Sequence, residues 1–293
     1  MVSSSERSTE LRRLISEGVV MLPGAFNALS ARMIEREGFS AMYLSGAVLA
    51  NSVGGVPDVG IMTLTEARDH AAHVAAVTRI PIIMDADTGY GDGPYNVART
   101  VRVLESVGVS GMHLEDQEFP KRCGHLKHVR LVSPEEMCEK INAAMAAKTS
   151  RDFLLIARTD ARGVLGYDEA VRRAHAYLRA GADAIFPEAL ESKAEFERFA
   201  TDVDTILLAN MTEFGKTPYL TADEFAEMGY NLVIFPVTLQ RCAMQATLEA
   251  LRTLKAERSQ KSLVGRMQTR RELYDLLGYD VPAPATERPV GKV

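Results

Sequence analysis

Val109-Ser110-Gly111-Met112-His113-Leu114-Glu115-Asp116 is a short apolar run that ends in two acidic residues. The run shows little alternation of apolar and polar side chains, which is typical of a parallel strand buried on both faces. Short apolar runs of the same character occur at seven other places: 19–23, 41–44, 80–84, 153–157, 184–186, 205–209 and 232–235. The sequence therefore contains eight candidate parallel strands.

Longer amphipathic stretches lie between these runs, among them 134–147, 167–180 and 222–228. Ser133 followed by Glu136 is a typical helix start, and Thr221 with Glu224 repeats the pattern. Strands and helices that alternate eight times predict a (β/α)8 TIM-type barrel. An open doubly wound sheet is the alternative, but residues 24–27 after the first run lack the glycine-rich fingerprint of that fold.

The chain has 293 residues, a formal net charge of -5 and 46% hydrophobic residues. We expect one barrel domain over 1–280, including a C-terminal helical segment, and a flexible tail over 281–293. The charge gives no support for a nucleic-acid or membrane partner, and no apolar run approaches the ~20 residues that span a bilayer. The three cysteines, Cys123, Cys138 and Cys242, are widely spaced, which argues against a disulfide framework and for a reducing cytoplasm.

Polar and charged residues follow nearly every run at the same end, where a barrel carries its active site. Asp85 and Asp87 come after the third run, two residues apart, so their side chains share a face on an extended chain. With Glu115 they supply hard oxygen ligands that suit Mg²⁺ or Mn²⁺. A turn cluster without metal is the alternative because the glycine-rich loop 89–93 follows, but the strand-end position favours the metal.

Other strand-end residues fit the recognition of a small organic polyacid. Arg158 and Arg241 are candidates for bidentate pairing with carboxylates, although an ion pair with Glu188 is the alternative. Asn210 and Thr212 either donate hydrogen bonds to a second carboxylate or cap a loop. The pattern predicts a small dicarboxylate or tricarboxylate bound beside a divalent metal.

The loop Lys121-Arg122-Cys123-Gly124-His125 places a thiol, two cations and an imidazole just after the acidic pair. Such crowding is typical of acid–base chemistry, while a solvated charged turn with an incidental cysteine is the alternative. A nucleophilic hydrolase is disfavoured because residues two apart seldom present a thiol and its base together. A second glycine-rich loop, 54–60, would bring Asp58 to the same rim.

Several motifs along the chain are shared with one known family: 43–46, 57–60, 85–91, 96–100, 115–117, 120–125, 157–161, 186–189, 208–218 and 267–270. Through them the chain resembles the isocitrate lyase/phosphoenolpyruvate mutase superfamily from about residue 22 to 279, and within it the lyases that act on 2-methylisocitrate. The loop 121–125 is specific to the lyase branch, since mutases and some hydrolases lack it.

The resemblance implies a barrel with bound Mg²⁺ and a homotetramer in which a C-terminal helix, over 267–277, is exchanged between subunits. It implies that Asp85 and Asp87 hold the metal, directly or through water, with Glu115 and Asp58 near it. The substrate-binding residues that it implies are Ser45, Gly46, Ala47, Cys123, Gly124, Arg158, Glu188, Asn210, Thr212, Arg241 and Arg270.

The implied reaction is a retro-aldol (Claisen-type) cleavage of 2-methylisocitrate to pyruvate and succinate, in propionate catabolism by the methylcitrate cycle. Cys123 would protonate the succinate carbanion, with Lys121 and His125 tuning the thiol. The base that removes the hydroxyl proton is Asp58, a water on the metal, or Tyr43. The loop 117–128 would close over bound substrate and exclude water.

The competing activities lie on the same fold, and fold alone does not decide among them. They are 2,3-dimethylmalate lyase or another 2-hydroxydicarboxylate lyase, isocitrate lyase, and, less favoured, oxaloacetate hydrolase or phosphonate mutase. Isocitrate lyases are usually much longer than this chain. Phe186 and Ile234 are candidates to bound a pocket for the substrate methyl group, but one methylene changes binding by only ~1–3 kcal/mol.

Overall fold

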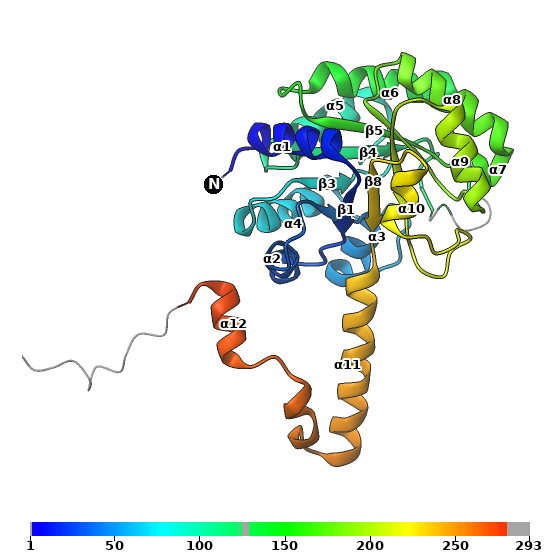
Figure 1. Ribbon diagram of the computed structural model, residues 1–293. Coiled ribbons are helices and arrows are strands. Elements are labelled where there is room, and N and C mark those ends of the chain that lie inside the picture. The colour runs from blue at the N-terminus through cyan, green and yellow to red at the C-terminus, as the bar shows by residue number, and fades with distance from the viewer. Residues whose placement is uncertain (1, 123, 125–128, 280–293) are drawn as a thin grey trace, which may run out of the picture. The chain divides into compact units, whose positions relative to one another are not determined.

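The computed structural model describes residues 2–122, 124 and 129–279 (Figure 1). The chain divides into two compact units, Met1–Ala243 and Met244–Val293. The tail expected over 281–293 lies outside the described residues. Among the described residues, no helix is both long enough and apolar enough to cross a membrane.

The first unit contains, in its described residues, eight parallel strands wound into a nearly closed barrel. They are β1 (Val20–Pro23), β2 (Met42–Leu44), β3 (Ile82–Asp85), β4 (Gly111–Glu115), β5 (Leu154–Thr159), β6 (Ala184–Pro187), β7 (Ile206–Asn210) and β8 (Leu232–Phe235). The hydrogen-bonded order is β1-β8-β7-β6-β5-β4-β3-β2, and a parallel bridge between Gly24 and Tyr43 links β1 to β2. The predicted (β/α)8 barrel is thereby confirmed, with each strand within two residues of its expected start and end.

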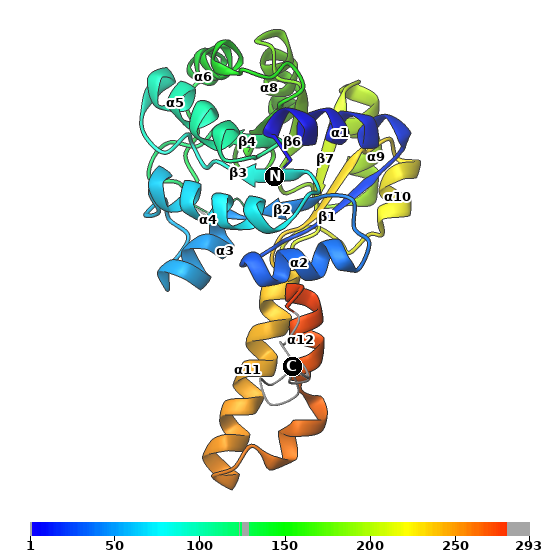
Figure 2. The ribbon, with the colours of Figure 1, turned by 90° about the vertical axis from the view of Figure 1, so that its left-hand side faces the viewer.

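Helices follow the strands around the outside of the barrel (Figures 1 and 2). The α-helices are α1 (Ser4–Glu17), α2 (Ala28–Arg36), α3 (Gly46–Leu49), α4 (Leu64–Val77), α5 (Gly93–Ser106), α6 (Pro134–Ala147), α7 (Ala161–Leu165), α8 (Tyr167–Arg179), α9 (Lys193–Asp202), α10 (Ala222–Glu227), α11 (Thr238–Glu257) and α12 (Arg270–Leu277). Short turns of π-helix at Ala50–Gly54 and of 3-10 helix at Lys261–Arg266 complete the set. Ser133 caps α6, and Thr221 forms the expected capping box at α10.

The helix α1 closes the N-terminal end of the barrel (Figure 2). Its Arg7 is buried and donates to the carbonyl oxygens of Ala75, Thr78 and Gly108, all of which precede barrel strands. Ser8 donates to the carbonyl of Ser110 at 3.1 Å. The acceptors of Arg7 lie at or just beyond the C-terminal ends of α4 and α5, where carbonyl oxygens lack a partner within the helix, so this end of the barrel is a structural cap.

The strand register brings the polar residues together at the opposite end. Asp85 of β3 pairs with His113 of β4, and Glu115 of β4 pairs with Arg158 of β5. Arg158 in turn pairs with Phe186 of β6. Since parallel neighbours in register point their side chains to the same side of the sheet, the register places the charged groups of three strands in two successive rows of the barrel mouth, Asp85 with His113 and Glu115 with Arg158.

Candidate active site

A small pocket lies at the C-terminal end of the strands, with a cavity volume of about 70 Å³. Its described lining residues are Tyr43, Ser45, Ala47, Asp58, Asp85, Lys121, Arg122, Gly124, Arg158, Phe186, Glu188, Asn210, Thr212, Ile234, Pro236 and Val237. Most residues predicted for catalysis and substrate binding therefore meet in one place. Phe186 and Ile234, which were expected to bound an apolar part of the pocket, also line it.

Asp85 is fixed at the end of β3 by backbone donors. Its carboxylate accepts from the N–H of Gly46 at 3.1 Å and from the N–H of Asp87 at 3.0 Å. Burial alone would raise its pKa, but the nearby His113, Lys121 and Arg158 outweigh burial and lower the pKa of Asp85 to about 2. A Cβ at Gly46 would lie 2.9 Å from carboxylate oxygens of Asp85 and Asp87, so only glycine fits there.

Lys121 joins the two acidic loops of the site. Its Nζ is 2.6 Å from Asp58 Oδ1 and 2.8 Å from Asp87 Oδ1, and the side chain is buried. Asp87 has a pKa raised to about 6, because burial and the charges of Asp85 and Asp58 outweigh Lys121. Although burial opposes its charge, the surrounding carboxylates raise the pKa of Lys121 well above its usual value, so it remains a cation.

Glu115 provides the test of whether a divalent metal fits. Both of its carboxylate oxygens are buried and accept no hydrogen bond among the described residues, and burial raises its pKa well above the usual value. A buried carboxylate without donors needs a cation or a proton. No three acidic, His or Cys side chains converge as direct ligands within the described residues. That arrangement suits a hard cation that keeps several waters and takes one or two carboxylates from the protein.

Arg158 is a buried cation among three carboxylates. Its Nε and Nη2 donate to Asp160 at 3.1 and 2.9 Å, and Glu188 and Glu115 lie at 3.4 and 3.5 Å. Its guanidinium carbon is 5.1 Å from the ring centre of Phe186, which holds it from one side. The ion pair with Glu188, weighed from the sequence as the alternative to substrate binding, is therefore present.

Gly124 packs directly on the Arg158 group. A Cβ added at this buried glycine would lie 2.1 Å from Asp160 Oδ1 and 2.7 Å from Arg158 Nη2. No side chain can be accommodated there, so glycine is required for the close approach.

Tyr43 and His113 form a buried pair below the pocket. Tyr43 Oη is 2.6 Å from His113 Nε2, and His113 Nδ1 is 3.6 Å from Asp85 Oδ1. Burial lowers the pKa of His113 to about 4 and raises the pKa of Tyr43 well above its usual value, so both are neutral. No role was assigned to His113 from the sequence; its signal was its position two residues before Glu115 on the same strand.

Several predicted residues are placed elsewhere. Arg241 is outside the pocket lining, where its Nη1 donates to the carbonyl oxygen of Glu213 and its guanidinium lies 5.0 Å from the ring centre of Phe214. Arg270 begins α12 in the second unit, so its assignment stays a prediction. Cys123, His125 and the centre of the loop 117–128 lie outside the described residues.

Asp160 and Gln117 are site residues that received no role from the sequence. Asp160 holds Arg158, and the side chain of Gln117 bonds the backbone of Arg122 twice, through Nε2 to the carbonyl at 2.8 Å and through Oε1 to the N–H at 2.9 Å. Both belong to strand-end motifs and their partners lie close by in the chain, but the pairing itself is visible only in the structure.

Comparison with known proteins finds several relatives of this chain. The phosphoenolpyruvate phosphomutase family model matches residues 11–255. A 2-methylisocitrate lyase of Aeropyrum pernix is 50% identical over 270 residues, which are 92% of this chain and 86% of the relative.

Two solved structures share the fold closely. A 2,3-dimethylmalate lyase has a TM-score of 0.88 and 38% identity, covering 95% of this chain and 92% of the other. An oxaloacetate acetylhydrolase, solved with the inhibitor 3,3-difluorooxalacetate, has a TM-score of 0.88 and 37% identity, covering 95% of each chain.

Proposed function

The chain belongs to the phosphoenolpyruvate phosphomutase family, and we propose that it is a lyase that cleaves 2-methylisocitrate to pyruvate and succinate. The observation that carries the proposal is the single pocket in which Asp85 and Lys121 face Arg158. These residues bring a metal-binding carboxylate and a carboxylate-binding guanidinium to one place, as the chemistry of a polyacid substrate requires. The loop 121–125 and the 50% identity to a 2-methylisocitrate lyase favour the lyase over mutase chemistry.

The divalent metal is proposed to be Mg²⁺, or Mn²⁺ in its place, held by Asp85 and Asp87 with Glu115 beside it. When bound, the ion would supply Lewis-acid activation of the substrate hydroxyl and its adjacent carboxylate. The cradle at Gly46 and the donor-free oxygens of Glu115 support this assignment.

The residues of the pocket would hold the substrate by its carboxylates. Ser45, Gly46 and Ala47 lie at the N-terminal end of α3, and Ser45 and Ala47 line the pocket together with Arg158. Asn210 donates to Glu188 at 3.3 Å and leaves its own buried side-chain oxygen without a hydrogen-bond partner in the described residues. We assign this oxygen to a polar hydrogen of the substrate, since an unpaired buried acceptor is costly.

We infer the proton-transfer steps from the protonation states of the residues in the pocket. Asp58 is the proposed base, because the raised pKa of Tyr43 makes the phenol a proton holder near neutrality. After Asp58 takes the hydroxyl proton, the C2–C3 bond breaks, its electron pair moves to the succinate carbon, and the C2 oxygen becomes the pyruvate carbonyl. Cys123 then donates its thiol proton to that carbon, beside the cations Lys121 and Arg122. His125 is assigned with them to the tuning of the thiol.

A product assay tests the proposal. The purified protein is incubated with 2-methylisocitrate, isocitrate, 2,3-dimethylmalate or oxaloacetate, with EDTA or with Mg²⁺, and the products are identified by mass spectrometry. We expect pyruvate and succinate from 2-methylisocitrate, only with Mg²⁺. Fastest cleavage of 2,3-dimethylmalate would support the second candidate, which the 38% identical 2,3-dimethylmalate lyase favours. Oxalate released from oxaloacetate would instead contradict the lyase assignment.

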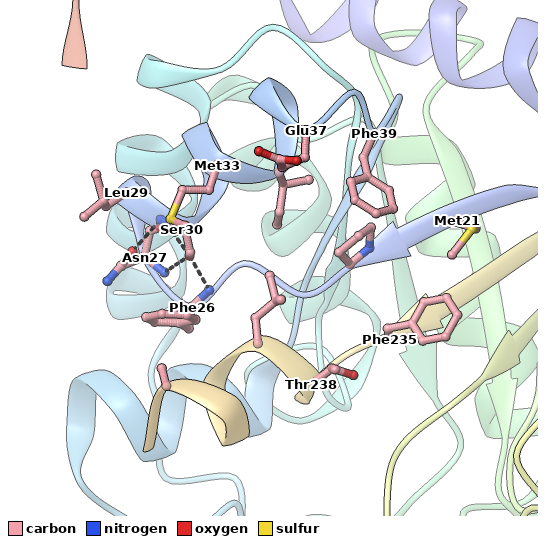
Figure 3. Close-up of a pocket in the computed structure, with 14 residues that line it drawn as sticks. Met21, Phe26, Asn27, Leu29, Ser30, Met33, Glu37, Phe39, Phe235 and Thr238 are labelled. Atoms are coloured by element: carbon pink, nitrogen blue, oxygen red, sulfur yellow. Dashed lines mark hydrogen bonds between the residues drawn. The ribbon is translucent and has the colours of Figure 1, made fainter. Parts of the chain in front are cut away.

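We further propose a cytoplasmic homotetramer with an exchanged C-terminal helix. An apolar groove of about 590 Å³ lies over the outer face of β1 and β8, beside α2 (Figure 3). Met21, Phe26, Met33 and Phe39 are among the side chains that line it. In the second unit, α11 exposes a stripe of apolar residues at helical spacing: Met244, Leu248, Leu251 and Leu254. Light scattering at several concentrations should give a mass near four times 32.1 kDa.

A further inference from the structure

Asp116 is a fully buried carboxylate that follows Glu115 but does not line the pocket. Four groups donate to its side chain: Thr159 Oγ1 at 2.8 Å, the N–H of Asp160 at 2.9 Å, Arg173 Nη1 at 3.0 Å and Tyr177 Oη at 2.7 Å. The first two belong to the end of β5 and the last two to α8. Asp116 therefore fixes the strand end that carries Arg158 against an outer helix.

The same cluster holds both stems of the loop that carries Cys123. The N–H of Val132 donates to the carbonyl oxygen of Asp116 at 3.0 Å, and Arg173 Nη1 donates to the carbonyl oxygen of Val132 at 2.9 Å. Two residues further into the loop, the N–H of Glu118 donates to the carbonyl oxygen of Arg130 at 2.9 Å. The places where the loop leaves and rejoins the barrel are thus tied to the backbone of Asp116 and to Arg173, which donates to the Asp116 carboxylate.

The connection to the reacting groups runs through Asp160. Its backbone is held by Asp116, and its carboxylate binds the Arg158 guanidinium through two nitrogens. Gly124 packs against this carboxylate, at a distance that allows no side chain. A shift of Asp160 would therefore move Arg158 and the loop together.

We propose that Asp116, Arg173 and Tyr177 form a positioning cluster that holds Arg158, and the two described stems of the loop at Glu118 and Val132, in the positions that the reaction requires. The inference rests on the proposed lyase function for the reaction it serves. A buried ion pair is seldom needed for stability, because well-packed apolar residues of similar volume are often as stabilising. A misplacement of about 1 Å in a catalytic group, by contrast, can lower a rate by roughly 100-fold.

The test is the substitution Tyr177→Phe, which removes one donor to Asp116 and keeps the ring. Its matched control is Tyr230→Phe, since Tyr230 is also buried and its hydroxyl donates to the carbonyl oxygen of Phe196 at 3.4 Å, in an aromatic group with Phe225. Asp116→Ala is less informative, because it leaves Arg173 without its buried anion and can prevent folding.

We expect Tyr177→Phe to lower kcat for 2-methylisocitrate about fivefold to tenfold, with KM and the Mg²⁺ requirement within twofold of wild type. We expect kcat rather than KM to change because Arg158 would still bind a substrate carboxylate, although not in the orientation that the reaction requires. Tyr230→Phe should leave kcat within twofold even if both variants unfold at a lower temperature. Equal kcat values in the two variants would overturn the proposal.

Hydrogen exchange gives a second readout that does not depend on activity. In Tyr177→Phe the amides of Glu118, Val132 and Asp160 should exchange faster than in wild type, whereas in Tyr230→Phe they should not. If the wild-type protein cleaves none of the acids, the proposed function is wrong. The exchange rates would still show whether Asp116, Arg173 and Tyr177 hold the loop stems and Asp160 in place. Unchanged exchange at all three amides in Tyr177→Phe would overturn the proposal.

Discussion

Two buried arginines, Arg7 and Arg158, lie at opposite ends of the same barrel and meet different partners. Arg7 at the N-terminal end donates to backbone carbonyl oxygens, and burial lowers its pKa. Arg158 at the C-terminal end lies among Asp160, Glu188 and Glu115, which raise its pKa well above the usual value although burial opposes its charge.

This difference in partners distinguishes the N-terminal end of the barrel, which has a structural role, from the C-terminal end, which carries the reactive groups. Around Arg7 the contacts satisfy carbonyl oxygens at or just beyond the C-terminal ends of α4 and α5, so a substitution there should affect folding. Around Arg158 the carboxylates exceed the cations, and some of their oxygens accept no hydrogen bond in the described residues. Such an excess of negative charge is costly in a folded core and is typical of a site that completes itself with a ligand.

The largest effect is expected at the reactive end, from Arg158→Gln. The glutamine lacks the charge and the planar fork, so two charge-assisted hydrogen bonds of ~1.5–3 kcal/mol each are lost. We expect kcat/KM for 2-methylisocitrate to fall by about 10³-fold at saturating Mg²⁺. Steady-state kinetics on protein whose circular dichroism matches wild type provide the measurement. Arg158→Lys keeps the charge and should lose less; a variant with wild-type kcat/KM would remove Arg158 from the site.

At the structural end, Arg7→Met should act on stability alone. Three backbone carbonyl oxygens lose their donor, so the free energy of unfolding should fall by roughly 2–4 kcal/mol, while kcat of the folded protein stays within twofold. Urea unfolding followed by activity measurement checks both. Arg13→Met is the control, because Arg13 lies on the same helix but is exposed, and it should change stability by less than ~1 kcal/mol. A large loss of kcat in Arg7→Met would break the division between the two ends.

The smallest effect concerns His70, a buried histidine of α4. Burial, with His73 adding, lowers the pKa of its imidazole in the folded protein, so near pH 6 the folded state binds fewer protons than the unfolded state. Its contribution to stability is therefore full above the unfolded pKa of about 6.5 and is lost as the pH falls below that value. His70→Gln should flatten the fall of unfolding free energy between pH 7.5 and 5.5 more than His73→Gln does, since His73 is exposed. If the unfolding free energy of wild type and of His70→Gln changed with pH in the same way, His70 would not be the source of this pH dependence.

The sequence predicts the strands better than it predicts their ends. Asp85, Glu115 and Asn210 are each the last residue of a strand, although the apolar runs stop before them. A strand is defined by backbone hydrogen bonds, whereas an apolar run reports only which side chains are buried. These three side chains therefore belong to the rigid sheet, whereas Asp58, Asp87 and Lys121 lie in the loops that follow strands. The long helix α11 was not among the expected elements.

The residues of the site were largely predictable, but their pairings were not. Strand-end position was enough to select Asp85, Lys121, Arg158 and Asn210, which line the pocket. That Asp116 receives donors from α8 depends on segments that meet only in the fold, and that Arg158 binds the nearby Asp160 depends on side-chain directions that the sequence does not give. Composition and spacing indicate the chemistry that a residue can perform, but they do not identify the residue with which it pairs.

The most direct measurement is the turnover of 2-methylisocitrate by Cys123→Ser. Serine keeps the size of the side chain but is a much weaker acid, so the carbanion loses its proton donor. We expect kcat to fall by roughly 10²–10⁴-fold, with KM within a few-fold of wild type and the Mg²⁺ requirement unchanged. Full activity in Cys123→Ser would contradict the account.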